Sequence, residues 1–197
     1  MEEITKLIGN TDIYVIDQIL KGRYSEGQKI LDAGCGYGRN LKWFFHNKFD
    51  IYGVDCSEEA ILEAKIMYAE SAGNFIKSDI KKMPFKNHFF DHIITSAVLH
   101  FANDKAHFYK MISELERVLK VKGSLLVRMA SSFATNNAFE HIQNGIYALR
   151  DGDERFLMNQ EILDTICNDF KLSLIEPIKT TNVNDLRCMT TLVFEKV

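Results

Sequence analysis

The sequence predicts an α/β fold built on a mainly parallel sheet. Three observations support this. Short apolar runs that resemble strands alternate with stretches of helical periodicity, the usual pattern of such proteins. The first run leads into a glycine-rich turn at 34–38. Acidic residues then close three successive runs, at Asp32, Asp55 and Asp79. Because parallel strands end at the same edge of a sheet, these acids are expected near one site.

The first elements begin close to the amino terminus. Apolar residues at helical spacing predict a helix at 12–20. Residues 29–33 form a short apolar strand that runs into the glycine turn. A second helix begins at Leu41, and residues 51–55 form the second strand.

The middle of the chain continues the alternation. Ser57 is expected to cap the next helix, because its hydroxyl can accept a hydrogen bond from a free N–H group. Strands are expected at 74–79 and 91–96. A helical stripe then runs over residues 108–119, and we expect Gly123 to end that helix.

The last elements complete a seven-stranded pattern. A fifth strand begins at 125–127, and Asn159 is expected to cap a further helix. Two more strands are expected at 172–177 and 189–194. The polar stretch between them, 179–187, is expected to be a loop.

An insert at about 132–156 separates the fifth strand from the Asn159 helix. Within it, Phe139, Ile142, Ile146 and Leu149 recur at helical spacing, which predicts a short amphipathic helix. Because it leaves the carboxyl end of a strand, this helix would form a lid over a ligand site. The alternative, that its apolar face completes the core, uses the same residues and stays open.

Composition sets limits on the function. The chain has 197 residues, 46% hydrophobic and 26% charged, and no internal repeat. These values indicate one globular domain over residues 1–197. The net charge of −3 gives no bulk attraction to nucleic acid, since neutralising phosphates requires a basic excess.

The compartment is expected to be the cytoplasm. The start of the chain lacks a basic flank followed by an apolar run, so no secretory signal is expected. The most apolar segment, 93–102, is too short to span a membrane. The cysteines Cys35, Cys56, Cys167 and Cys188 form no paired motif, so we expect reduced thiols and no metal site.

The glycine turn disfavours a dinucleotide. A dinucleotide fingerprint starting at Gly34 would need glycine at position 39, which is Arg39, and the third glycine is Gly38. Asp32 would repel a pyrophosphate but suits a ligand that carries an ammonium and a sulfonium. Glycines at a turn from strand to helix also let the backbone approach a ligand closely.

The acids after the next two strands fit a nucleoside. Asp55 can accept hydrogen bonds from ribose hydroxyls; the alternative is that it caps the following helix. Asp79 can accept from an adenine amine while the Ile80 N–H donates to a ring nitrogen. Cys56 and Ile80 would supply apolar walls for the ring.

Five sequence blocks, taken together, resemble the class I S-adenosylmethionine-dependent methyltransferases. In chain order they are LDAGCGYGRN (31–40), IYGVDCS (51–57), FIKSDIKKMPF (75–85), FDHIITSAVLHF (90–101) and LERVLKVKGSLLVRM (115–129). The resemblance implies a Rossmann-like seven-stranded sheet with helices on both faces and the last strand antiparallel. The run Gly38-Arg39-Asn40 is also similar to tellurite-resistance-type methyltransferases.

The same resemblance assigns roles to residues. Asp32, Gly34 and Gly36 would contact the methionine part of S-adenosylmethionine, and Ser96 with Ala97 would line the floor beneath the sulfonium. Asp55 would bind the ribose, and Asp79 with Ile80 the adenine. The full set of expected cofactor-binding residues is Asp32, Gly34, Cys35, Gly36, Arg39, Asp55, Cys56, Asp79, Ile80, Ser96 and Ala97.

The acceptor is less constrained. Methyl transfer from a sulfonium expels a neutral thioether, so alignment and exclusion of water can supply most of the rate. The chain lacks the Asx-Pro-Pro block and the Pro-Cys nucleophile found in many nucleic-acid methyltransferases. A small molecule methylated on oxygen, nitrogen or sulfur is therefore expected.

Acceptor-side candidates come from several elements. Tyr14 lies on the first helix, and His100 has the pKa class of a general base, although either can be structural. Arg128 interrupts an apolar strand and could hold an acidic acceptor or extend to solvent. Phe133 and Arg155 flank the helix expected within the insert. Two other functions stay open: a non-catalytic S-adenosylmethionine-binding regulatory module, and a nicotinamide-dependent oxidoreductase.

Overall fold

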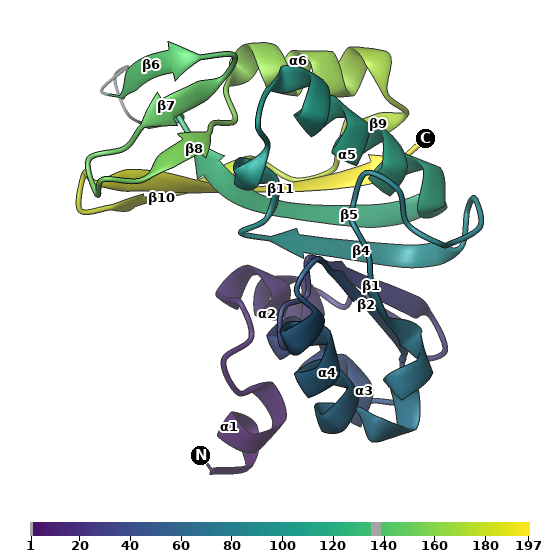
Figure 1. The fold of residues 1–197 in the computed structure, drawn as a ribbon. Coiled ribbons are helices and arrows are strands. Elements are labelled where there is room, and N and C mark those ends of the chain that lie inside the picture. Colours follow the sequence, from purple (N-terminus) through teal and green to yellow (C-terminus); the bar gives the residue numbers. More distant parts are fainter. Residues whose placement is uncertain (1, 135–138) are drawn as a thin grey trace.

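A computed structural model of the chain describes residues 2–134 and 139–197. The strands of the central sheet are β1 (Lys29–Ala33), β2 (Asp50–Asp55), β3 (Phe75–Lys77), β4 (Phe90–Ser96), β5 (Leu119–Ser131), β9 (Leu172–Leu174), β10 (Lys179–Val183) and β11 (Arg187–Lys196). They form an eight-stranded sheet in the order β10-β11-β5-β4-β1-β2-β3, with β9 beside β11 (Figure 1). The first five strands pair in parallel, whereas β11 is antiparallel to its neighbours β5, β9 and β10. This confirms the predicted fold class.

Helices cover both faces of this sheet (Figure 1). One face carries α2 (Ile13–Leu20), α3 (Lys42–His46) and α4 (Glu58–Met67), and the other carries α5 (Lys105–Val118) and α6 (Gln160–Asp169). A further helix, α1 (Glu2–Ile8), precedes α2. The predicted caps are confirmed, since Ser57 accepts from the Ala60 N–H at 3.2 Å and Asn159 from the Ile162 N–H at 2.9 Å.

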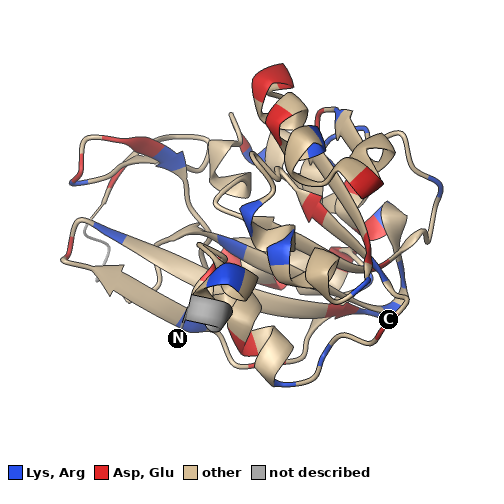
Figure 2. Cartoon of the chain, turned by 90° about the horizontal axis from the view of Figure 1, so that it is seen from below, with Lys and Arg blue, Asp and Glu red and all other residues tan. Residues whose placement is uncertain are grey.

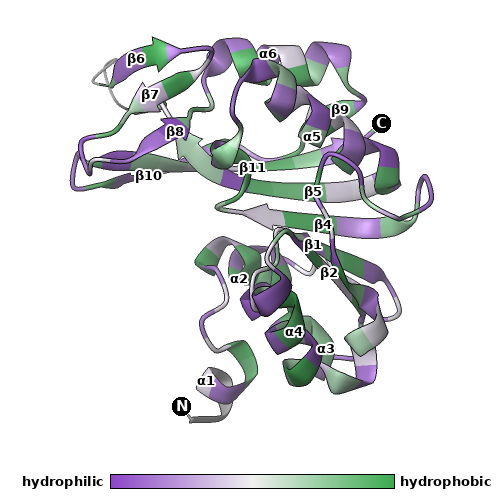
Figure 3. Cartoon of the chain, in the orientation of Figure 1, coloured by the Kyte–Doolittle hydropathy of each residue, from purple (hydrophilic) through white to green (hydrophobic). Residues whose placement is uncertain are grey.

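The core is divided by the sheet into two layers. Leu125 of β5 packs in a cluster with α5 and α6, and its neighbour Leu126 packs in a cluster with α2, α3 and α4. Successive residues of a strand point to opposite faces, so a strand buried on both faces reads as a continuous apolar run. Figure 3 shows these long hydrophobic stretches in the central strands.

The sheet has one strand more than the predicted seven. This strand, β10, lies where the sequence predicted a polar loop. Asn184 and Asp185 both have positive φ, at 52° and 56°, between β10 and β11. Two consecutive positive φ values are typical of the tight turn that joins hairpin strands. The loop prediction for 179–187 was therefore wrong for its first half, because threonines and a hairpin turn stabilise an edge strand there.

The helix predicted within the insert was also wrong. The described part of the insert contains β6 (Glu140–Gln143), β7 (Ile146–Ala148) and β8 (Glu154–Phe156), which form a separate antiparallel sheet. Asn144 and Gly145 have φ of 50° and 91°, and Asn-Gly is the strongest short-range hairpin signal. That turn overrides the helical spacing of the apolar residues; residues 135–138 of the insert lie outside the described residues.

The small sheet has a core of its own. Phe139, Leu149 and Leu157 are buried against Ala130 and Met189, which lie on β5 and β11. Of the two roles considered for the insert, this packing supports completion of the core. Closure over a site stays a prediction.

The boundary between α5 and β5 differs from the prediction. The helix ends at Val118 and the strand begins at Leu119, so Gly123 lies within β5. A Cβ at Gly123 would come within 2.6 Å of the Asp91 carbonyl oxygen, so this glycine permits close approach of two strands. Within the described residues, no helix has both the length and the apolar character needed to cross a membrane.

Candidate active site

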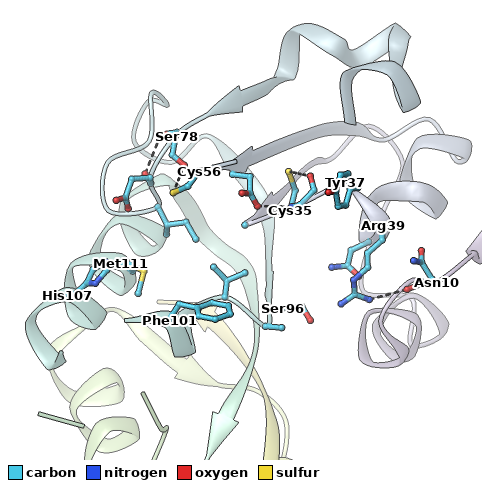
Figure 4. Close-up of a pocket in the computed structure, with 18 residues that line it drawn as sticks. Asn10, Cys35, Tyr37, Arg39, Cys56, Ser78, Ser96, Phe101, His107 and Met111 are labelled. Carbon is cyan, nitrogen blue, oxygen red and sulfur yellow. Dashed lines mark hydrogen bonds between the residues drawn. The ribbon is translucent and has the colours of Figure 1, made fainter. Parts of the chain in front are cut away.

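A cavity of about 570 Å³ opens at the carboxyl ends of β1, β2 and β4 and at the turn after β3 (Figure 4). This is the edge of an open α/β sheet where ligands normally bind. Its lining residues are Asn10, Gly34, Cys35, Gly36, Tyr37, Arg39, Asn40, Asp55, Cys56, Ser78, Asp79, Ile80, Ser96, Ala97, Val98, Phe101, His107 and Met111. They include every expected cofactor-binding residue except Asp32.

The glycine turn forms one wall. Gly34 has φ of 79°, and a Cβ on it would lie 2.3 Å from a methyl carbon of Val98. Gly36 has φ of 51°, and a Cβ there would meet nothing within 4 Å. The first glycine is therefore required by packing, and the second leaves the backbone bare toward the cavity.

Asp55 joins the end of β2 to this turn. Its Oδ2 accepts from the Gly36 N–H at 2.8 Å, and its Oδ1 accepts from the Ser57 N–H at 2.9 Å. Because Ser57 itself caps α4, the alternative that Asp55 is the cap is wrong. The carboxylate is instead held at the cavity wall.

Asp79 lies in the turn after β3. Its Oδ1 accepts from the Lys81 N–H at 2.9 Å, and its Oδ2 is 3.0 Å from the Lys81 ammonium. Burial alone would raise the pKa of Asp79, but these bonds to Lys81 outweigh it and lower the pKa. The side chain stays ionised and exposed, while Ile80 beside it is buried and apolar.

Asp32 does not reach the cavity, contrary to its expected contact with the cofactor. It lies inside β1 and is fully buried. Neither oxygen accepts a hydrogen bond of normal geometry from any residue that the structure describes. Burial raises the pKa of Asp32 to about 7, although Arg39 and the Asn40 amide act in the opposite direction.

Asn10 lines the cavity on the side of Arg39, and residues 11 and 12 follow it (Figure 4). The Arg39 guanidinium donates to the Asn10 carbonyl at 3.0 Å, and the Thr11 hydroxyl donates to the Arg39 carbonyl at 3.0 Å. The Asp12 N–H donates to Asn40 Oδ1 at 3.1 Å. This segment therefore holds the Arg39-Asn40 turn in place.

Asp12 was missed by the sequence reasoning, although it is the first residue of the helix predicted at 12–20, where a capping side chain is expected. Its Oδ1 accepts from the Tyr14 N–H at 2.9 Å, so it caps α2. Its Oδ2 accepts from the Ser96 hydroxyl at 2.9 Å. Ser96 ends β4 and lines the cavity. The residue that caps α2 is therefore bonded to a residue of the cavity wall.

Ala97 follows Ser96 in a left-handed conformation, with φ of 63°. Its N–H donates to the Arg128 carbonyl at 2.7 Å. A positive φ is uncommon for a residue with a Cβ. The hydrogen bond to β5 therefore fixes a sharp turn at the floor of the cavity.

None of the acceptor-side candidates, all of which lie in the described part of the chain, lines this cavity. Tyr14 and Arg128 do lie together, with the guanidinium 5.5 Å from the ring centre. The Tyr14 hydroxyl lies 2.7 Å from the Thr181 hydroxyl on β10. They form a layer behind Ser96, between α2 and the sheet.

His100 fits its structural alternative. Its Nδ1 accepts from the Ala130 N–H at 3.2 Å. Burial lowers the pKa of His100 to about 4, with Arg155 and Arg187 adding to the effect. The ring is therefore neutral near pH 7, with its proton on the other nitrogen.

The two candidates within the insert, Phe133 and Arg155, differ. Phe133 packs partly buried against the core cluster of α5 and α6. Arg155 lies with its guanidinium 4.8 Å from the centre of the Phe101 ring, and Phe101 lines the cavity. Arg155 therefore borders the site through an aromatic neighbour.

Several lining residues had no role assigned from sequence. Tyr37 and Asn40 belong to the glycine-rich block 31–40. Their position in that block could have identified them as lining residues. Phe101, His107 and Met111 follow β4, and only the topology brings them to the cavity.

Comparisons with known proteins agree with this architecture. A family model described as a methyltransferase domain matches residues 31–127. A malonyl-[acyl-carrier protein] O-methyltransferase from Buchnera aphidicola is 31% identical over 155 residues, which cover 77% of this chain and 58% of that protein. The chain thus spans less than two thirds of that relative.

Solved structures share the fold. A TehB-like SAM-dependent methyltransferase from Corynebacterium glutamicum superposes with a TM-score of 0.68 at 21% identity, covering 95% of this chain and 90% of that one. Magnesium protoporphyrin IX methyltransferase from Synechocystis, with bound SAH, gives 0.69 at 20% identity, covering 94% and 81%. Together with the family model, these likenesses confirm the resemblance found in the sequence. Residues 31–127 therefore form a methyltransferase domain of the S-adenosylmethionine-dependent kind, and S-adenosylmethionine is its cofactor.

Proposed function

We propose that this methyltransferase methylates an oxygen, nitrogen or sulfur atom of a small molecule. The main support is that one cavity joins Asp55 and Asp79 to Ser96 at the end of β4. Its volume of about 570 Å³ lies in the range of small-ligand sites, about 300–1,000 Å³.

The residues fit S-adenosylmethionine. Gly36 leaves an open backbone surface, and within the described part of the chain each oxygen of Asp55 accepts one hydrogen bond, from the Gly36 or the Ser57 N–H. A carboxylate has further lone pairs for two ribose hydroxyls. We assign the adenine to Asp79 and Ile80, and the methionine part to the Arg39 side.

The chemistry needs little from the protein beyond placement. S-adenosylmethionine supplies a methyl group on a positive sulfur, which leaves as a neutral thioether. The glycine turn and Asp55 hold the nucleoside, and Ser96 with Ala97 forms the floor where the acceptor would approach. Alignment and exclusion of water then provide the rate enhancement.

Charge supports a small acceptor over nucleic acid. The net charge is −3, and Figure 2 shows basic and acidic residues interspersed over the described chain. The relatives above are named for malonyl-[acyl-carrier protein] and magnesium protoporphyrin IX. A protein that binds nucleic acid would instead be expected to carry a stripe of Lys and Arg side chains on one face.

The test has two stages. Calorimetry first measures binding of S-adenosylmethionine and S-adenosylhomocysteine. The protein is then incubated with S-adenosylmethionine and a panel of carboxylic acids, phenols, amines and thiols, and S-adenosylhomocysteine is measured by mass spectrometry. Turnover with one class supports the proposal; binding without turnover across the panel favours a regulatory module.

A further inference from the structure

The buried carboxylate of Asp12 lies behind the floor of the cavity. Asp12 Oδ2 accepts from the Ser96 hydroxyl at 2.9 Å and lies 3.4 Å from Arg128 and 3.8 Å from Arg39. Its side chain is only 4% exposed. Burying a charge is costly unless nearby groups compensate it, and the two guanidinium groups do so here.

This contact fixes the direction of the Ser96 hydroxyl. A serine hydroxyl carries one hydrogen and two lone pairs. The hydrogen is donated to Asp12, so only lone pairs remain for the cavity that Ser96 lines. Toward a ligand, Ser96 therefore acts only as an electron-rich acceptor.

Ser96 lies toward one end of the cavity. Figure 4 shows it on the side of Arg39 and Asn10, away from Ser78 and His107. With the nucleoside assigned to the Ser78 side, this end takes the part of the ligand beyond the ribose. That part is a positive sulfonium in the methyl donor and a neutral thioether in its product.

We propose that Asp12 is a positioning residue that aims the lone pairs of Ser96 into the cavity, so that the site prefers the charged methyl donor to its neutral product. The inference rests on the proposed function, because that function places the sulfur near Ser96. When the methyl group is transferred, the sulfur loses its positive charge. The site therefore binds the product, S-adenosylhomocysteine, less tightly than the donor.

The first test is Asp12→Asn. Asparagine caps helices as well as aspartate, so its oxygen keeps the bond to the Tyr14 N–H while its amide donates to Ser96. The hydroxyl hydrogen then turns from residue 12 toward the cavity. Calorimetry should show the preference for S-adenosylmethionine over S-adenosylhomocysteine falling about tenfold, the equivalent of one charge-assisted hydrogen bond.

A double-mutant cycle tests whether the effect passes through Ser96. Ser96→Ala alone should lower the same preference, and Asp12→Asn should change it less than about twofold in that background. Asp17→Asn is the matched control: it removes another carboxylate of α2, which is bonded to Lys21 and Lys179, and should leave the preference unchanged.

The outcomes separate the two proposals. Equal weakening of both ligands by Asp12→Asn, or no change in either, overturns the role of Asp12. An undiminished effect in the Ser96→Ala background also overturns it, because the charge would then act without the hydroxyl. If the unmodified protein binds neither ligand, the proposed function itself fails.

Discussion

The Asp55 carboxylate is bonded to the Gly36 N–H on one oxygen and to the Ser57 N–H on the other, at 2.8 and 2.9 Å. It thus connects the turn after β1 to the start of α4 while facing the cavity. A residue in this position both shapes the site and faces its ligand. Its removal is therefore expected to act on binding more than on folding.

Asp55→Ala should weaken binding of S-adenosylhomocysteine by about 1–3 kcal/mol, the usual cost of losing a charged hydrogen-bond partner. Isothermal calorimetry measures the change directly. Glu59→Ala, which removes an exposed carboxylate from the first turn of α4, is the control. Unchanged affinity in the Asp55 variant would show that the ribose assignment is wrong.

Bound nucleoside should protect one thiol selectively. Cys56 and Cys167 are exposed, whereas Cys35 and Cys188 are buried, and only Cys56 of the exposed pair lines the cavity. Burial, together with Asp79 and Asp55, raises the pKa of Cys56, so labelling is best done near about pH 9, where more thiolate forms. S-adenosylhomocysteine should slow modification of Cys56 and leave Cys167 unaffected, as followed by peptide mass spectrometry.

Asp32 should make the ligand-free protein less stable as the pH rises. Its pKa is about 7 in the folded protein, against an ordinary value of 3.8. Between these values the folded state binds more protons than the unfolded state, so the free energy of unfolding falls with rising pH. Asp32→Asn removes this component, and urea unfolding between about pH 4 and 8 measures it. If the free energy of unfolding of the two proteins varied with pH in the same way, Asp32 would not have the raised pKa.

His100 should act in the opposite sense. Its pKa is about 4 in the folded protein and ordinarily 6.5, so the unfolded state binds more protons between these values. The free energy of unfolding therefore rises with pH between these two pKa values, and above the higher one His100 no longer reduces it. His100→Asn keeps an acceptor for the Ala130 N–H and should flatten this rise. It should leave the affinity for S-adenosylhomocysteine unchanged; a large loss of affinity would place the ring in the site.

The hydroxyl contact between Tyr14 and Thr181 should be measurable as a coupling. Tyr14→Phe removes a 2.7 Å hydrogen bond between α2 and β10, at an expected cost of about 0.5–1.5 kcal/mol. Thr181→Val removes the other partner. The double variant should cost less than the sum of the two single changes, as measured by urea unfolding, and strict additivity would mean that the contact does not contribute to stability.

Much of the fold followed from local signals. The parallel strands are buried on both faces and therefore stand out as apolar runs, and Ser57 and Asn159 cap helices through their own side chains. The insert was mispredicted because its apolar residues satisfy a helical spacing, although Asn144-Gly145 specifies a hairpin. There the turn residues decide the structure, and periodicity alone is a weaker guide.

The site was predictable where it follows the strands. Gly34, Asp55 and Asp79 could be placed because each is either the last residue of a strand or part of the turn that follows it. Asp32 could not, because a position inside a strand points to one face or the other and the sequence does not say which group will meet it. Asp12 reaches Ser96 across 84 positions of the chain, a contact that only the tertiary fold creates.

The attachment of α2 bears on the order of events during synthesis. Besides the Tyr14–Thr181 contact, Asp17 of this helix is bonded to Lys179 at 2.6 Å, so an early helix depends on a late hairpin. A nascent chain still lacking that hairpin holds the helix only through its packing against α3 and the earlier strands, so these two bonds are absent. On the ribosome, the helix that Asp12 caps therefore gains its full set of contacts only after β10 and β11 have emerged.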